Sequence, residues 1–126
     1  MATVGTPFSG LTQLGAWTYQ TYDLTLICYI NSQNSLNDNS VFGDLIQPTV
    51  ANGYAPITLN HTVWVNTNGI MTYSPNPTWS ASGVWSATVN GYAIYYSTTL
   101  LHFKDLSVPF NAASGKKLTI DLTTVV

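Results

Sequence analysis

Alternating apolar and polar residues, in short runs separated by turn-forming residues, dominate the chain. Two runs show the alternation most clearly, residues 22–31 and residues 116–125. A period of two places every second side chain on the same face of an extended strand, so each run is predicted as a strand with one face packed inward. The inward positions are Leu24, Leu26, Cys28 and Ile30 in the first run, and Leu118, Ile120 and Leu122 in the second.

Segment 84–106 carries β-branched and aromatic residues in three short groups. Asn90 and Gly91 separate the first two groups, and Asn-Gly is the preferred pair for a two-residue hairpin because both positions tolerate a positive φ. A weaker break lies at residues 97–99. The segment is therefore predicted as three consecutive antiparallel strands joined by tight turns.

Residues 54–65 and 70–73 also have strand character. Asn68 and Gly69 lie between them and predict a second hairpin. His61 falls within the first of these predicted strands, where it is expected to be a structural residue.

Two segments are predicted to lie outside the central strands. Residues 31–40 are the most polar stretch of the chain and predict a surface loop. In residues 74–83, Pro75 and Pro77 cannot donate a backbone hydrogen bond, so this segment cannot be a central strand. Trp79 is therefore expected on a loop or at a sheet edge.

About seven or eight short strands, with no helix beyond one turn in residues 41–48, predict an all-β chain. The expected fold is a single antiparallel β-sandwich or small jelly roll formed by residues 21–126. Residues 1–20 contain three glycines and Pro7, which argue against a stable helix. They are predicted as an N-terminal arm or edge strand that covers its own sandwich or reaches a neighbouring subunit.

Charge is scarce, with three lysines, five aspartates, no arginine and no glutamate in 126 residues. Only 6% of the residues are charged, against roughly 25% in ordinary globular domains. Nucleic acid and acidic membranes both require clustered Lys or Arg, so neither is an expected partner. Because 40 residues are Thr, Ser or Asn, we expect much of this neutral surface to be covered by other subunits; a neutral monomer is the alternative.

Candidate chemistry is sparse. His61 and His102 are the only imidazoles, and no nucleophile motif or metal-ligand spacing accompanies them. Cys28 is the only cysteine and is expected to be a small buried hydrophobe. The sequence therefore predicts no catalytic, cofactor-binding or metal site, and a protein that is not an enzyme.

Aromatic residues allow two interpretations. Trp79, Trp85 and neighbouring tyrosines form either a sugar-stacking platform or part of a core or subunit interface, and the second is favoured because aromatic residues dominate both. Apolar residues in the N-terminal segment are candidates for a clamp between subunits. The candidate interface residues are Phe8, Leu11, Leu14, Trp17 and Trp79.

The first ten residues lack the charged start and continuous apolar core of a signal peptide. No apolar run approaches the roughly 20 residues of a membrane span. We therefore expect folding in a cytoplasm and no membrane partner.

Several short motifs, taken in order, resemble a layout found in small virion structural proteins of tailed bacteriophages, including the cyanophage type. The resemblance covers residues 22–124 and implies a β-sandwich that assembles in the virion and catalyses nothing. The motifs are LTLICYIN (24–31), FGDLIQPTVANGYAPITL (42–59), WSASG (79–83), VNGYAIYY (89–96), LLHFKD (100–105) and GKKLTIDL (115–122).

This resemblance and the uncharged surface together suggest a capsid decoration or cement subunit. Such a subunit forms a homo-oligomer, with a trimer favoured, and binds other virion proteins, above all the major capsid protein. It resides in the virion after assembly in the host cytoplasm. The alternatives are a tail, neck or baseplate component and, from a different class, a host-glycan-binding module.

Overall fold

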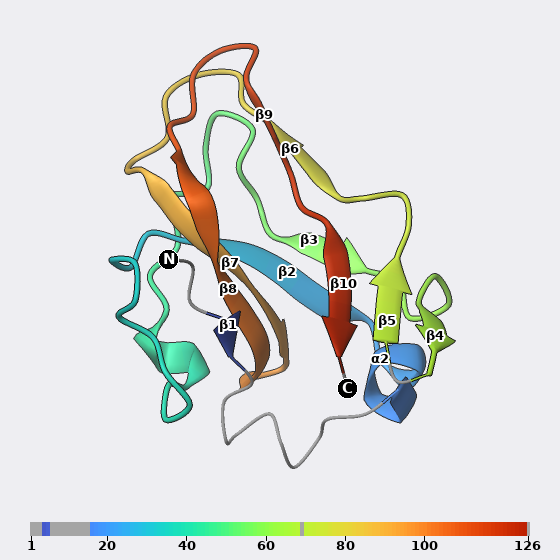
Figure 1. Cartoon of the computed structure of the whole chain (residues 1–126). Helices are drawn as coiled ribbons and strands as arrows, with labels where there is room; N and C mark the ends of the chain where they lie inside the picture. Colours follow the sequence, from blue (N-terminus) through green and yellow to red (C-terminus); the bar gives the residue numbers. More distant parts are fainter. Residues whose placement is uncertain (1–3, 6–15, 69, 126) are drawn as a thin grey trace.

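The computed structural model describes residues 4–5, 16–68 and 70–125, which form packed layers of antiparallel β-sheet (Figure 1). One layer is a five-stranded sheet with the order β1-β8-β7-β2-β3. The other layer contains a three-stranded sheet, β10-β5-β4, and the strand pair β6-β9. The prediction of an all-β sandwich is therefore confirmed.

Ten strands occur among the described residues, more than the seven or eight expected, because several predicted runs are divided into two. They are β1 (Val4–Gly5), β2 (Leu24–Tyr29), β3 (Ile57–Leu59), β4 (Val65–Thr67), β5 (Ile70–Tyr73), β6 (Thr78–Ser80), β7 (Val89–Tyr96), β8 (Thr99–Phe110), β9 (Lys117–Thr119) and β10 (Leu122–Val125). The helical elements are α2 (Ala16–Thr21) and the 3-10 helix η1 (Phe42–Asp44).

The main core lies between the layers. Leu24, Leu26 and Cys28 of β2 belong to the same buried cluster as Met71 of β5 and Leu122 of β10. Leu118, Ile120 and Leu122 are buried, and the intervening Thr119, Asp121 and Thr123 are exposed. The alternation predicted for residues 116–125 is thus confirmed, although the strand is divided into β9 and β10.

A second, smaller core covers the outer face of the five-stranded sheet. Ile27 and Tyr29 of β2 pack there with Phe103 of β8 and with Leu36 from the polar loop after β2. Both faces of β2 are consequently buried, whereas the sequence predicted one. The polar loop of residues 31–40 covers this face of the sheet, since its single leucine, Leu36, belongs to the buried cluster and is 5% exposed.

The hairpin predicted at Asn90 and Gly91 is wrong. Both residues lie inside β7, and Gly91 is paired with Tyr29 of β2 and with Asp105 of β8. A Cβ atom at residue 91 would overlap the Tyr29 ring. Glycine is needed here for the close approach of an aromatic side chain, not for a turn.

Other predicted turns are present. Ser97, with φ of 56°, lies in the turn between β7 and β8, and Asn68, with φ of 52°, follows β4. Asn52 and Gly53 also have positive φ values, 53° and 91°. A Cβ atom at Gly53 would overlap the backbone oxygen of Ser80, so this turn can pack closely against β6.

The N-terminal region differs from its prediction in one respect. Residues 16–21 form the helix α2, although no helix was expected in residues 1–20. The helix begins immediately after Gly15 and contains neither glycine nor proline, which explains why the local argument against a helix does not hold there. Val4 and Gly5 form β1, which pairs with the edge of β8.

Candidate functional site

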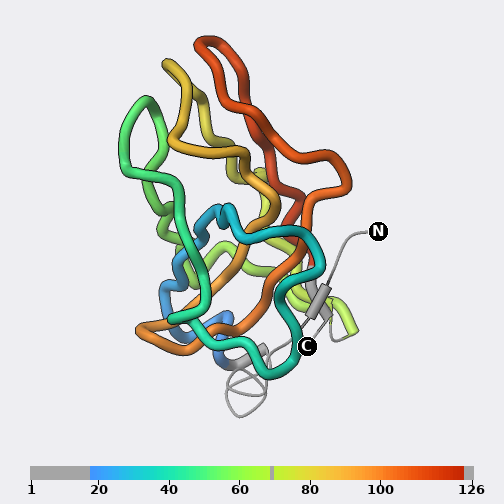
Figure 2. Tube along the Cα trace, turned by 90° about the vertical axis from the view of Figure 1, so that its left-hand side faces the viewer, coloured from blue at the N-terminus to red at the C-terminus, as the bar shows by residue number. Residues whose placement is uncertain are grey.

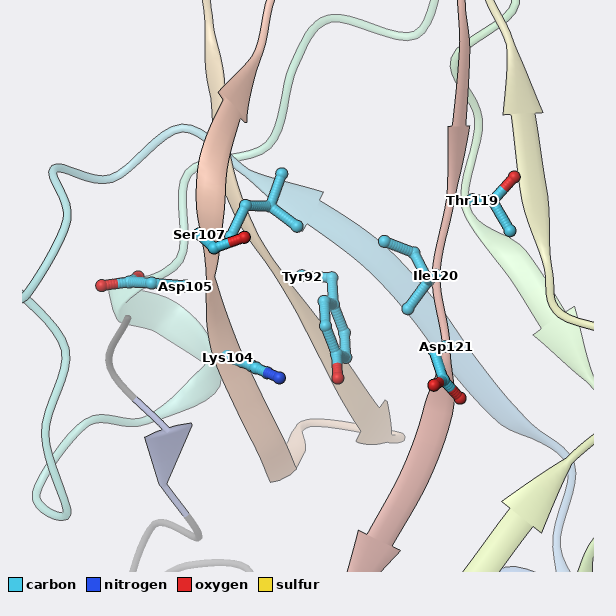
Figure 3. A pocket seen from close by; sticks show the side chains of 8 residues that line it. Tyr92, Lys104, Asp105, Ser107, Thr119, Ile120 and Asp121 are labelled. Carbon is cyan, nitrogen blue, oxygen red and sulfur yellow. The ribbon is translucent and has the colours of Figure 1, made fainter. Parts of the chain in front are cut away.

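A cleft of about 260 Å³ opens between β8 and the residues that connect β9 to β10 (Figure 3). Its side chains come from β7, β8 and this connection. It is lined by Tyr92, Lys104, Asp105, Leu106, Ser107, Thr119, Ile120 and Asp121.

Strand register explains how polar groups reach this cleft. Tyr92 of β7 is paired directly with Lys104 of β8, so both side chains leave the same face of the sheet. Figure 3 shows Lys104 and the Tyr92 hydroxyl directed toward the cleft, with Asp121 on the opposite side and Asp105 pointing away.

Burial and charge define the protonation state of the cleft tyrosine. Tyr92 is 5% exposed, and its pKa is raised to about 12, first by burial and then by Asp121 and Tyr19. The phenol is therefore neutral at ordinary pH and can donate or accept a hydrogen bond. Within the described part of the chain, Lys104 and Asp121 do not form an ion pair with each other.

Such an arrangement suits a small polar molecule with no net charge. The ammonium of Lys104 can donate, the carboxylate of Asp121 can accept, and the Ser107 hydroxyl can do either. No nucleophile in the cleft is hydrogen-bonded to a base among the residues that the structure describes. In the same described ranges, no group of three His, Cys, Asp or Glu side chains is arranged to hold a metal ion.

A buried polar centre lies on the other side of β8. The Tyr29 hydroxyl donates to Oδ1 of Asp105 at 2.5 Å, and the backbone N–H of Asn34 donates to Oδ2 at 2.7 Å. The side chain of Gln33 donates to the carbonyl oxygen of Leu106 at 2.6 Å. Burial and the Asp105 carboxylate together hold the pKa of Tyr29 well above its usual value. These contacts attach the loop after β2 to β8 and have a structural role.

The two histidines lie apart on different elements. His61 occupies a turn after β3, not the predicted strand, and its Nδ1 lies 2.7 Å from Oδ1 of Asp23. His102 lies in β8, 9% exposed, and its pKa is lowered to about 4, first by burial and then by Lys104. Cys28 is fully buried, and burial holds its pKa far above the usual value, so its thiol is a poor nucleophile.

Predicted interface residues fall into two groups. Phe8, Leu11 and Leu14 lie outside the described residues, and of Trp17 only its backbone position in α2 is described. Trp79 lies in β6, is 3% exposed, and donates its indole N–H to the carbonyl oxygen of Ala55 at 2.7 Å. Trp79 is thus a core residue of the folded chain, and its place at an interface stays a prediction.

Three loops meet at one end of the sandwich, which we call the tip: residues 47–53, 81–88 and 111–117. Hydrogen bonds join them, from Ser82 N to Asn52 O at 2.9 Å and from Ala81 N to Lys116 O at 2.8 Å. The side chain of Asn52 also donates to Val84 O at 2.8 Å. In both overall views the tip projects beyond the rest of the molecule (Figures 1 and 2).

Away from the tip, residues 31–44 form a polar lobe with a hollow of about 390 Å³. Internal hydrogen bonds hold its shape, including Asn31 Nδ2 to Asp44 O at 2.8 Å and Val41 N to Asp44 Oδ2 at 2.9 Å. The hollow is lined by Asn31, Ser35, Leu36, Asn37, Asn39, Ser40 and Asp44.

Large aliphatic side chains are exposed at both places. At the tip, Val50 is 65% and Val84 is 72% exposed; at the lobe, Val41 is 47% exposed. Further exposed aliphatic residues are Ile46, Val65, Ile70 and Val108. Exposed apolar groups near each other mark candidate contact surfaces.

Sequence reasoning did not identify the cleft, the tip or the lobe as sites. The one available signal for the cleft was a lysine at a position that alternation places inward, Lys104. The tip combines three loops distant in sequence, so only the folded chain brings them together, whereas the lobe is the continuous segment 31–44.

Comparison with protein families, with curated proteins and with solved structures finds no match for this chain. In the ranges described, none of the helices has the length and apolar character needed to span a bilayer.

Proposed function

We propose that this chain is a non-enzymatic structural subunit that associates with copies of itself and with other subunits. One observation carries the proposal: aliphatic side chains are exposed at both the tip and the lobe of a molecule whose aromatic residues are largely buried. Val50 and Val84 are 65% and 72% exposed, whereas Trp79 is 3% exposed. A surface of this kind gains stability when a partner covers it.

The scarcity of charge supports the same function. With only eight Lys and Asp residues in 126, contacts between subunits bury few unpaired charges, and an unpaired buried charge is costly. The neutral Thr, Ser and Asn side chains can exchange hydrogen bonds with water for hydrogen bonds across an interface.

The resemblance to small virion proteins of tailed bacteriophages extends this proposal to a particle. The subunit decorates or cements a capsid shell and binds the major capsid protein there; a tail, neck or baseplate position is the alternative site in the same particle. Mass spectrometry of purified particles from the phage that encodes the chain tests the location. Many copies per particle support it, and absence from the particles contradicts it.

A glycan-binding role through stacked aromatic side chains receives less support. Trp85 is 5% exposed and donates its indole N–H to Asn52 O at 2.9 Å, as Trp79 does to Ala55 O. Neither ring offers an open face for a sugar.

Self-association is tested with the full chain by light scattering after size-exclusion chromatography. Val50→Asp with Val84→Asp should reduce the mass of the assembled species, because charge at the tip opposes apolar contact. Thr58→Asp, an exposed position on the edge strand β3, is the matched control and should retain the assembly. If wild-type and tip variant have identical masses, the tip valines take no part in assembly.

A further inference from the structure

The tip carries positive charge and the lobe carries negative charge. Residues 47–53, 81–88 and 111–117 of the tip contain Lys116 and Lys117 and no acidic residue. The lobe, residues 31–44, contains Asp38 and Asp44 and no basic residue. Two of the three lysines of the chain are therefore at the tip.

The other three aspartates lie outside the lobe, and each has its own neighbours there. Asp105 is 1% exposed and bonded to Tyr29. Asp23 is paired with His61, and Asp121 faces the cleft that Lys104 also lines. Both lobe aspartates are exposed, and Oδ2 of Asp44 also accepts a hydrogen bond from Val41 N at 2.9 Å.

Shape complements charge at the same two places. The tip projects from the sandwich (Figures 1 and 2). Lys116 and Lys117 are exposed, and β9 begins at Lys117. The lobe is hollow, with Asp44 and a set of Asn and Ser side chains as hydrogen-bond acceptors around a space of about 390 Å³. An ammonium group has three donors and no acceptor, so a hollow lined by such oxygens suits it.

Internal hydrogen bonds prepare the lobe for a partner. The Asn31 side chain donates to Asp44 O at 2.8 Å and accepts from Ile46 N at 2.8 Å, and Asn37 N donates to the Ser40 hydroxyl at 2.8 Å. Because the hollow exists before contact, little conformational freedom is lost when a partner enters it.

We propose that copies of this chain associate head to tail, with the tip of one copy seated on the lobe of the next. Lys116 and Lys117 approach the hollow, which Asp44 lines, and the exposed Asp38 of the same segment, while Val50 and Val84 approach the exposed Val41. This inference rests on the proposed function, since it names the contact through which the subunit associates. A heterologous contact of this kind forms a closed ring or an open filament, depending on the rotation between copies.

The test uses two conservative variants of the full chain. The tip variant is Lys116→Gln with Lys117→Gln, and the lobe variant is Asp38→Asn with Asp44→Asn. Each variant alone should be monomeric at concentrations where the wild-type chain assembles, which sedimentation velocity measures. An equimolar mixture should form a one-to-one dimer and nothing larger, because it contains one intact tip and one intact lobe per pair.

Two single-substitution controls remove charge of the same sign elsewhere. Lys104→Gln and Asp23→Asn each remove one charge outside the tip and lobe and should leave the wild-type assembly intact. Far-ultraviolet circular dichroism checks that all four proteins keep their β structure.

Each outcome that contradicts the proposal can be distinguished from the others. Wild-type mass in either variant alone overturns the head-to-tail contact and leaves self-association standing. Loss of assembly in both variants without a dimer in the mixture overturns the pairing of tip with lobe. A wild-type chain that stays monomeric throughout overturns the proposed function as well.

Discussion

The Tyr29 hydroxyl donates a hydrogen bond to Asp105 across the five-stranded sheet, with 2.5 Å between the two oxygens. Asp105 is 1% exposed, so water cannot replace this donor. Tyr29→Phe should therefore lower the free energy of unfolding by about 2 kcal/mol, which is within the range for a hydrogen bond to a charged group. Urea denaturation followed by circular dichroism measures the change.

Tyr95→Phe is the control for this experiment. Tyr95 is half-buried on the next strand, β7, and packs against Phe42 with 4.3 Å between ring centroids. Removing its hydroxyl should change stability by less than about 0.5 kcal/mol. Equal effects of the two substitutions would contradict a special role for the Tyr29–Asp105 bond.

Gly91→Ala should be among the most damaging single-methyl changes in the chain. The new Cβ would overlap the Tyr29 ring inside the sheet, and overpacking of this kind costs about 1–3 kcal/mol or more. At Gly43, where a Cβ would meet nothing within 4 Å, alanine should be nearly neutral. Thermal unfolding of the two variants compares them, and equal midpoints would refute the account given for Gly91.

Stability should fall as the pH falls from about 6.5 to about 4 because of His102. Its pKa is lowered from 6.5 to about 4 in the folded chain, so in this range the unfolded chain binds a proton that the folded chain does not. The loss at pH 4 is about 3 kcal/mol by linkage. His102→Gln should flatten this part of the curve of unfolding free energy against pH; equal slopes in wild type and His102→Gln would contradict the prediction.

Tryptophan fluorescence should not respond to polysaccharide. In a Trp17→Phe background the emission comes from Trp64, Trp79 and Trp85, each at most 5% exposed. Acrylamide should quench these residues weakly, and host polysaccharide at millimolar concentration should leave their emission unchanged. A saturable change in emission would favour the glycan-binding alternative.

Local pattern was sufficient to predict the sandwich and several of its strands. The buried positions Leu118, Ile120 and Leu122 follow directly from alternation, and the turns at Asn68 and Ser97 follow from local residue chemistry. These features depend on neighbours in sequence, which is the range over which such patterns carry information.

What the sequence could not predict depends on contacts between residues that are distant in sequence. Asn90 and Gly91 have the composition of a hairpin, yet Gly91 is required by Tyr29, which lies far away in sequence and adjacent in the sheet. Trp79 lies at a sheet edge, as predicted, because β6 belongs to a two-stranded sheet, yet its side chain is buried in a cluster with residues distant in sequence such as Tyr54. The cleft and the tip likewise arise only when remote segments meet.

Sedimentation velocity of the full-length wild-type chain, over a range of concentrations and at low and high salt, tests the central claim most directly. We predict an assembled species that grows with concentration or persists as one closed oligomer, and that weakens at high salt because Lys116, Lys117, Asp38 and Asp44 are exposed. A monomer at every concentration and salt would contradict the claim that this chain is a self-associating structural subunit.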